Sequence, residues 1–174
     1  TRVAKAIRGL ERGAGIFIDD NPIQCAEDIR DKVRRLKREH ALGLVIIDDL
    51  QLVRMSGSGE DSDDVRLEVI RSLKAMARES GVPLLLLSRL NRSLERRGDK
   101  RPRMSDMSGA TDIEDEADIV VFLYREAHYN PSFPNPESTD VIVAKNREGS
   151  TGRIWLNFRG EYFRFDSEAE GALG

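Results

Sequence analysis

The chain has 174 residues, 39% of them hydrophobic and 34% charged, which is enough for one domain with a full core. Its single cysteine and two histidines exclude an internal disulfide and offer no ligand set for zinc. No segment has the length of a membrane span or opens the chain as a signal segment, so we expect a cytoplasmic protein, and the net charge of -3 leaves only local basic patches for nucleic acid.

The N-terminal part predicts a helical remnant, a strand and a longer helix. The chain begins at Thr1 within regular sequence, as a piece of a longer protein would, and residues 1–14 are expected to be the remnant. Residues 15–20 predict a strand, and Asn21 and Pro22 offer an N-cap and a first residue for a helix that ends at His40. One face of this helix is basic: Arg30, Lys32, Arg34, Arg35, Lys37 and Arg38. Such a face can contact DNA, but we expect a solvated outer face.

The run from Leu44 to Ile47 is apolar throughout and too short for a helix. It predicts a strand that is buried on both faces, which is typical of a parallel sheet. Asp48 then lies at the carboxyl end of the strand, where open α/β sheets bind ligands. A carboxylate there can hold Mg²⁺, as the Walker B aspartate does in P-loop nucleotidases. The alternative is that Asp48 merely ends a strand.

A second strand–helix–strand unit follows directly. After a polar loop at 56–63, apolar residues at helical spacing predict a helix that ends at Gly81, and residues 82–87 predict another buried strand. Consecutive units of this kind imply right-handed crossovers, a mostly parallel sheet and helices on both faces. The segment 91–103 carries five arginines and a lysine. Taken alone, it predicts an exposed linker at the ligand edge of the sheet.

The C-terminal part predicts strands at 119–124, 140–145, 153–158 and 162–165. Residues 126–139 contain three prolines and two asparagines, which predicts a loop and no helix. Short strands joined by brief turns are typical of antiparallel pairs at the edge of a sheet. We therefore divide the chain into a parallel α/β core at 15–125, antiparallel edge strands at 126–166 and a frayed tail at 167–174.

Several motifs agree with one another in order and spacing. They are LVIIDDLQL at 44–52, RSLKA at 71–75, VPL at 82–84, SRLNRSLE at 88–95, DKRP at 99–102, ADI at 117–119 and KNREG at 145–149. Together they resemble the C-terminal ATPase domain of the DnaB family of replicative helicases, from about Leu10 to Asp166. The resemblance implies a RecA-like P-loop NTPase fold and the motor of a hexameric DNA helicase. It also implies ATP and Mg²⁺ as cofactors, and single-stranded DNA, primase and a helicase loader as partners.

The resemblance assigns a nucleotide site. Asp48 matches the Walker B aspartate that holds Mg²⁺, with Asp49 beside it, and Ser88, Arg89 and Asn91 match a segment that is usually Ser-Gln-Leu-Asn-Arg. The glutamine of that segment is thought to sense the γ-phosphate. Arg89 stands in its place, and an arginine can reach phosphate but cannot accept a hydrogen bond from the attacking water.

Two basic residues match a catalytic pair that acts between subunits. Lys145 and Arg147 lie two apart at the end of a predicted strand, so both project to one side. In the family this pair reaches across the subunit interface, and the arginine neutralises charge on the γ-phosphate of the neighbour. The role requires an oligomer.

The DNA-binding loop is where the sequence departs from the family. The family usually has Arg-Glu-Ser-Gly in a loop that grips single-stranded phosphates, whereas this chain has Ser108, Gly109, Ala110 and Thr111. Backbone N–H groups of the loop can still bind phosphate, and Arg92 is a further candidate contact. The acidic residues that follow, from Asp112 to Asp118, predict the start of a helix rather than a metal site.

The sequence lacks the phosphate-binding motif G-x-x-x-x-G-K-S/T. In DnaB-like helicases this loop and the glutamate that activates water lie upstream of the matched region, so the chain is expected to hold half of an active site and to be inactive alone. The substitutions at Arg89 and Ser108 leave two alternatives open. These are a non-catalytic ring or scaffold subunit with the same fold, and a RecA-like recombinase ATPase.

Overall fold

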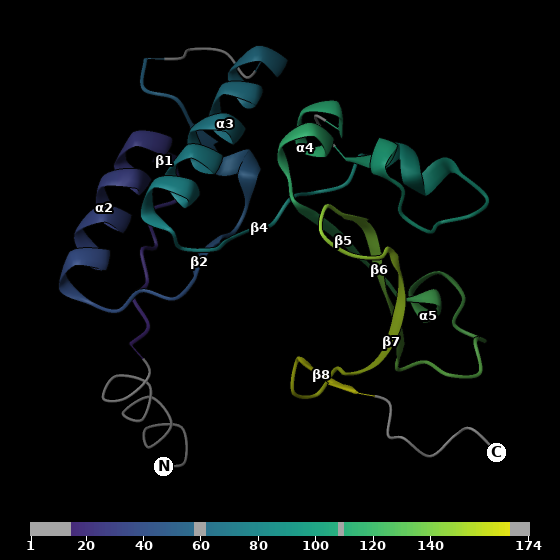
Figure 1. Ribbon diagram of the computed structural model, residues 1–174. Helices are drawn as coiled ribbons and strands as arrows, with labels where there is room; N and C mark the ends of the chain where they lie inside the picture. Colours follow the sequence, from purple (N-terminus) through teal and green to yellow (C-terminus); the bar gives the residue numbers. More distant parts are fainter. Residues whose placement is uncertain (1–14, 58–61, 108–109, 168–174) are drawn as a thin grey trace.

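The computed structural model describes residues 15–57, 62–107 and 110–167 (Figure 1). The expected helical remnant, most of the expected tail and two residues of the predicted DNA loop, Ser108 and Gly109, lie outside these ranges. No helix within the described ranges is long and apolar enough to cross a membrane.

The N-terminal half contains two helices and two short parallel ladders. The helices are α2 (Ala26–Glu39) and α3 (Asp63–Ser80), and the strands are β1 (Gln24–Cys25), β2 (Val45–Ile47), β3 (Val53–Arg54) and β4 (Leu84–Leu86). β2 pairs with β4 and β1 pairs with β3, both in parallel. The predicted parallel strands on either side of α3 are therefore confirmed.

The ends of α3 show why the sequence folds locally as it does. The Ser62 hydroxyl accepts a hydrogen bond from the backbone N–H of Val65 at 3.3 Å and satisfies one of the free donors of the first turn. Gly81 ends the helix with a φ of 60°, a left-handed backbone conformation that residues other than glycine rarely adopt. The predicted C-terminus of this helix is confirmed.

The core lies between α2, α3 and one face of the parallel strands. Its buried residues are Ala26, Val33, Leu50, Val53, Val69, Ile70, Leu73 and Met76. Val45 and Ile47 of β2 pack against this core, while Ile46 between them is 58% exposed. The prediction of a strand buried on both faces is therefore wrong for β2 in the described residues, where α2 and α3 share one face. An unbroken apolar run does not show which face is covered, because side chains alternate across a strand.

The predicted strand at 15–20 and the predicted helix start are also wrong. Residues 15–21 have no regular structure, and α2 begins at Ala26, after Cys25. The Asn21 side chain donates to the Asp19 carboxylate at 2.7 Å and caps no helix. A strand needs a paired neighbour, and the pairing here begins only at Gln24, opposite Val53. The acidic first turn of α2, Glu27 and Asp28, was the sequence signal for its true start.

The C-terminal half is an antiparallel sheet with the strand order β5-β6-β7-β8 (Figure 1). Its strands are β5 (Ile119–Tyr124), β6 (Ser138–Asn146), β7 (Gly152–Arg159) and β8 (Arg164–Ser167). The predicted antiparallel pairing is confirmed. The boundary at residue 125 is wrong, because β5 pairs with β6 and belongs to this sheet. Its alternation of buried Val120 and Phe122 with exposed Val121 and Leu123 fits a sheet that is packed on one face.

Two short helices adjoin this sheet. α4 (Ala110–Glu116) contains four of the five acidic residues that were predicted to start a helix, and Asp118 follows its end. α5 (Glu126–Tyr129) is a single turn within the segment that was predicted as a loop. The Asn130 N–H closes it by donating to the Glu126 carbonyl at 2.9 Å, directly before Pro131. One helical turn is too short to show a periodic pattern of apolar residues, so the prolines of this segment led to the prediction of a loop.

Candidate functional site

The carboxyl ends of β2 and β4 form one edge that gathers four of the predicted nucleotide-site residues. Ile47 and Leu86 are paired, and the pairing continues because the Leu87 N–H donates to the Ile47 carbonyl at 2.9 Å. The chain leaves β2 through Asp48 and Asp49 and leaves β4 through Ser88 and Arg89. These residues therefore meet where parallel α/β sheets bind ligands.

Arg89 is held at this edge by Asp49. The Arg89 Nε donates to Asp49 Oδ2 at 2.6 Å, and the Asp49 residue is only 8% exposed. An ionised carboxylate at this depth needs a cationic or hydrogen-bonding partner, and Arg89 supplies it. The Arg89 side chain is itself 68% exposed, and its Nη1 and Nη2 have no hydrogen-bond partner in the described residues. Arg89 thus offers free donors for an anion.

Gln51 connects the two strand ends and was not among the predicted site residues. Its Oε1 accepts from the backbone N–H of Arg89 at 3.3 Å, and its Nε2 donates to the Ser88 hydroxyl at 3.2 Å. The available signal was a polar residue between two leucines, Leu50 and Leu52, directly after the strand. Gln51 fixes the backbone from which Arg89 projects.

Asp48 is exposed and makes no hydrogen bond or ion pair through its side chain in the described residues. An unpaired carboxylate at a ligand edge fits a divalent cation, which prefers oxygen ligands. The described residues contain no cluster of three or more metal-ligating side chains. A Mg²⁺ ion at Asp48 would therefore take its remaining ligands from water and from phosphate oxygens, as Mg²⁺ commonly does.

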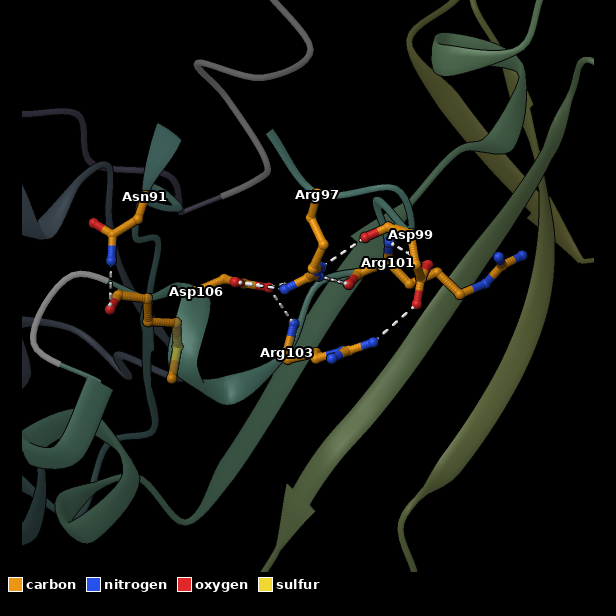
Figure 2. Close-up of polar contacts among 7 residues, drawn as sticks. Asn91, Arg97, Asp99, Arg101, Arg103 and Asp106 are labelled. Carbon is orange, nitrogen blue, oxygen red and sulfur yellow. Dashed lines mark hydrogen bonds and ion pairs between the residues drawn. The ribbon is translucent and has the colours of Figure 1, made fainter. Parts of the chain in front are cut away.

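Asn91 connects the nucleotide edge to the segment that precedes the predicted DNA loop. Leu90 pairs with Met107 as an antiparallel bridge. The Asn91 N–H donates to the Asp106 carbonyl at 2.6 Å, and its Nδ2 donates to the Met107 carbonyl at 3.2 Å (Figure 2). The position of Asn91 is therefore structural, because it links residues 88–91 to residues 106–107.

Asp106 is clamped by an arginine fork. Arg97 donates from its two terminal nitrogens to the two carboxylate oxygens of Asp106 at 2.9 and 3.1 Å, and the Arg103 N–H adds a third bond at 2.8 Å (Figure 2). The carboxylate belongs to a residue that is 4% exposed. Bidentate pairs of this kind combine charge with fixed geometry. The interpretation of 91–103 as a plain exposed linker is therefore wrong.

Asp99 completes this arginine network. Its Oδ1 accepts from the Arg101 N–H at 3.0 Å, and its Oδ2 accepts from the Arg103 guanidinium at 3.1 Å (Figure 2). The hydrogen bond from the Arg101 backbone, followed by the Arg103 side chain, holds the pKa of the Asp99 carboxyl below its usual value. Arg92, by contrast, is exposed and has no ion pair in the described part of the chain.

Lys145 and Arg147, at the end of β6, both contact the C-terminal half of α4. The Lys145 ammonium donates to the Glu114 carbonyl, and the Arg147 guanidinium donates to the Asp115 carbonyl. The predicted projection of both side chains to one side is confirmed. Cations stabilise the negative end of a helix dipole, so this placement is favourable. No hydrogen bond or ion pair joins either residue to the Asp48 edge in the described residues.

Asp118 holds Arg147 from a second direction. Its Oδ1 accepts from Arg147 at 3.2 Å, and its Oδ2 pairs with Lys74 of α3. The hydrogen bond from Lys74 and then the charge of Arg147 keep the pKa of the Asp118 carboxyl below its usual value. Asp118 therefore joins α3 to the end of β6.

A family model for the DnaB-like helicase C-terminal domain matches residues 1–167. The chain belongs to this family. It is 48% identical over 158 residues to the replicative DNA helicase DnaB of Geobacillus stearothermophilus and 45% identical over 158 residues to the replicative DNA helicase DnaC of Bacillus subtilis. Each match covers 90% of this chain and 35% of the relative. The chain thus spans about a third of the length of the curated relatives it matches.

Solved structures of related proteins share the fold. A DnaB-like replicative helicase, studied with its interactions with primase, superposes with a TM-score of 0.89 at 34% identity, covering 96% of this chain and 40% of that one. A second solved structure, an ATPase domain, gives the same TM-score and identity, covering 96% of this chain and 59% of that one. The predicted α/β fold class and the resemblance to the DnaB family are confirmed.

In this DnaB-like domain, half of the predicted DNA loop is outside the described residues. Ser108 and Gly109 are not described, and Ala110 and Thr111 are the first residues of α4. Two of the five acidic residues between Asp112 and Asp118 have basic partners: Glu116 pairs with Arg71 at 3.4 Å, and Asp118 pairs with Lys74. These ion pairs join Glu116 and Asp118 to basic residues of α3.

Proposed function

We propose that the intact protein is an ATP-driven replicative DNA helicase and that this domain is part of its motor. Membership of the DnaB-like family supports the proposal, as do curated relatives that are named replicative DNA helicases. The observation that carries it is the edge at β2 and β4. There a free carboxylate, Asp48, lies one strand away from Arg89, whose guanidinium keeps free donors.

We assign Asp48 to hold Mg²⁺ and Arg89 to contact phosphate. Magnesium neutralises charge that develops on the transferred phosphoryl group. Asp49 fixes the Arg89 guanidinium through Nε, and Gln51 fixes the Arg89 backbone and the Ser88 side chain. A guanidinium held in this way spends little conformational entropy when it binds phosphate. Arg89 thereby performs a different task from a glutamine, because it stabilises charge but does not orient water.

Lys145 and Arg147 would act on the nucleotide of a neighbouring subunit in a hexamer. Both now donate to main-chain carbonyls at the end of α4, and Arg147 also pairs with Asp118. A γ-phosphate carries more charge than a carbonyl, so it would compete well for the Arg147 guanidinium. Assembly then supplies the charge stabilisation that one subunit lacks.

Single-stranded DNA would pass along residues 108–111, with Arg92 as a further phosphate contact. The hydrogen bonds from Asn91 to the Asp106 and Met107 carbonyls support this proposal, because they join residues 88–91, the proposed phosphate contact, to the residues that precede this loop. A movement of Arg89 on ATP hydrolysis would therefore be transmitted to the residues that bind DNA. Primase and a helicase loader are the partners that we propose, and the cytoplasm is the proposed location.

The scaffold alternative relied on the substitutions at Arg89 and Ser108. Asp49 now gives Arg89 a structural partner at the same edge, so Arg89 need not signal a lost nucleotide site. The test uses the intact protein with Asp48→Asn, which removes the charge at constant size, and Asp20→Asn as an exposed control. Steady-state ATPase activity should fall by about a hundredfold or more in Asp48→Asn and stay unchanged in the control. Equal activity in the two variants would remove Asp48 from the site.

A further inference from the structure

The basic face of α2 lines a hollow between α2 and α3. Its lining residues are Arg30, Arg34, Lys37, Arg38, Met76, Glu79 and Ser80, and its volume is about 460 Å³. Figure 1 shows the two helices side by side. Three of the basic lining residues, Arg34, Lys37 and Arg38, are exposed, as expected for a solvated outer face, and Arg30 is partly buried. Lys32 pairs with Asp19, and Arg35 is not part of the lining.

The hollow carries an excess of positive charge. Its one carboxylate, Glu79, is already paired with Arg34 at 2.7 Å. Arg30, Lys37 and Arg38 have no ion pair in the part of the chain that the structure describes. The Arg30 Nε is buried there without a hydrogen-bond partner. A buried guanidinium nitrogen without a partner costs free energy, so an acceptor at this position would be stabilising.

The negative C-terminal ends of the two helices compensate only part of the positive charge of the hollow. Lys37 and Arg38 lie in the last turn of α2, where cations offset a helix end of roughly half a negative charge. The same effect falls off within one turn, so it does not explain Arg30, which lies in the first half of the helix. Two helix ends offset roughly one charge, whereas the hollow has three cations without an ion pair.

The hollow lies away from the nucleotide edge. α2 leads into β2 and α3 leads into β4, so the C-terminal ends of both helices lie near the amino ends of these parallel strands. Asp48 and Arg89 lie at the opposite, carboxyl ends. A ligand in the hollow would therefore leave the nucleotide edge free.

We infer that this hollow binds an acidic segment of a partner polypeptide, with carboxylates on Arg30, Lys37 and Arg38. The Ala77 and Arg78 carbonyls at the end of α3 already accept from Val82 and Gly81, but the Glu79 and Ser80 carbonyls accept no hydrogen bond in the described residues. A peptide has N–H groups that can donate to these two carbonyls, and a phosphate backbone has no such donor. The Met76 side chain gives the hollow an apolar base, which an apolar side chain of a peptide can contact and a phosphate backbone cannot. The inference does not depend on the proposed helicase activity.

The test uses the intact protein and a fluorescein-labelled twelve-residue peptide of alternating glutamate and leucine. Fluorescence anisotropy at low salt should show binding that is weakened about tenfold in the double variant Lys37→Gln/Arg38→Gln, because two of the contacting charges are lost. Arg35→Gln is the matched control, since it removes an exposed cation from the same helix outside the hollow. Its affinity should stay within about twofold of the parent.

A labelled oligothymidylate of equal charge distinguishes peptide from DNA. The double variant should bind this DNA as tightly as the parent does. A parent protein that does not bind the peptide at about 100 μM, or equal losses in the double variant and Arg35→Gln, would overturn the inference. A loss of DNA binding with unchanged peptide binding would also overturn it and would assign the hollow to nucleic acid.

Discussion

Arg89 and Asp49 form an ion pair that joins the carboxyl ends of two neighbouring parallel strands, with Arg89 Nε 2.6 Å from Asp49 Oδ2. The two side chains differ in exposure, 68% for the arginine and 10% for the aspartate. The pair therefore has a buried end that fixes it and an exposed end that is free to bind an anion. Arg89 is in this way both part of the fold and a candidate phosphate ligand.

Arg89→Gln should destabilise the domain because it leaves the Asp49 carboxylate buried and unpaired. Breaking a fully buried pair costs about 3–5 kcal/mol, and the exposure of Arg89 reduces this to roughly 1–2 kcal/mol in unfolding free energy. Urea denaturation of the intact protein, followed at the transition of this domain, measures it. The double variant Asp49→Asn/Arg89→Gln should recover most of the loss, and Arg92→Gln, which removes an exposed unpaired arginine, should cost little. Equal stability of Arg89→Gln and Arg92→Gln would contradict the role of the pair.

Asp106→Asn should have a larger effect. It removes the charge that receives the Arg97 fork and the Arg103 N–H at a residue that is 4% exposed. We expect a loss of about 2–4 kcal/mol in unfolding free energy, also measured by urea denaturation. Asp99→Asn is the matched control, since it alters an exposed carboxylate in the same network and should cost less. A smaller loss for Asp106→Asn than for Asp99→Asn would be incompatible with the clamp.

Asp118 should contribute stability that depends on pH. The pKa of its carboxyl is lowered in the folded chain, first by the Lys74 hydrogen bond and then by nearby charges that include Arg147. The ionised form therefore stabilises the fold above the ordinary pKa of 3.8, and this contribution disappears as the pH falls through that value to the lower folded pKa. An NMR titration of the Asp118 carboxyl should show the lowered pKa, and Lys74→Met should raise it. A pKa that Lys74→Met leaves unchanged would disprove the assignment.

Arg147→Ala should remove most of the ATPase turnover of the intact assembly and leave nucleotide binding nearly unchanged. An arginine that reaches the γ-phosphate of a neighbouring subunit acts mainly on charge that develops in the transition state. Its loss lowers the turnover rate on the order of a thousandfold or more. Mixed assemblies should regain part of the activity when Arg147→Ala subunits are combined with Asp48→Asn subunits, because each supplies the half that the other lacks. Turnover that Arg147→Ala leaves intact would rule out an action between subunits.

The local features of the fold were predictable where one residue decides the structure. Gly81 ends α3 because it accepts a left-handed conformation, and the glycine-bearing turns between β6, β7 and β8 marked antiparallel strands. The strand expected at 15–20 failed because pairing depends on a distant neighbour that the local pattern does not reveal. Apolar content alone specifies no partner.

The candidate site was predictable in position but not in its ion pairs. The strand ends placed Asp48, Asp49, Ser88 and Arg89 at one edge, since parallel strands end together. The Asp49–Arg89 pair joins residues that are 40 apart in the sequence, and Arg97 reaches Asp106 across a turn. Such pairs depend on strand register and loop path. Neither follows from the charge pattern, because residues 88–106 hold six arginines and only two aspartates.

A strand-displacement assay tests whether the intact protein is a DNA helicase, as proposed. A forked DNA duplex with one fluorescent strand is mixed with the intact protein, Mg²⁺ and ATP, and release of the labelled strand is followed over time. We expect ATP-dependent release that Asp48→Asn and Arg147→Ala abolish and that Asp20→Asn leaves unchanged. Strand exchange between homologous duplexes without unwinding would indicate a recombinase instead. Assembly of a ring that neither unwinds DNA nor hydrolyses ATP would indicate a scaffold subunit and would rule out a helicase.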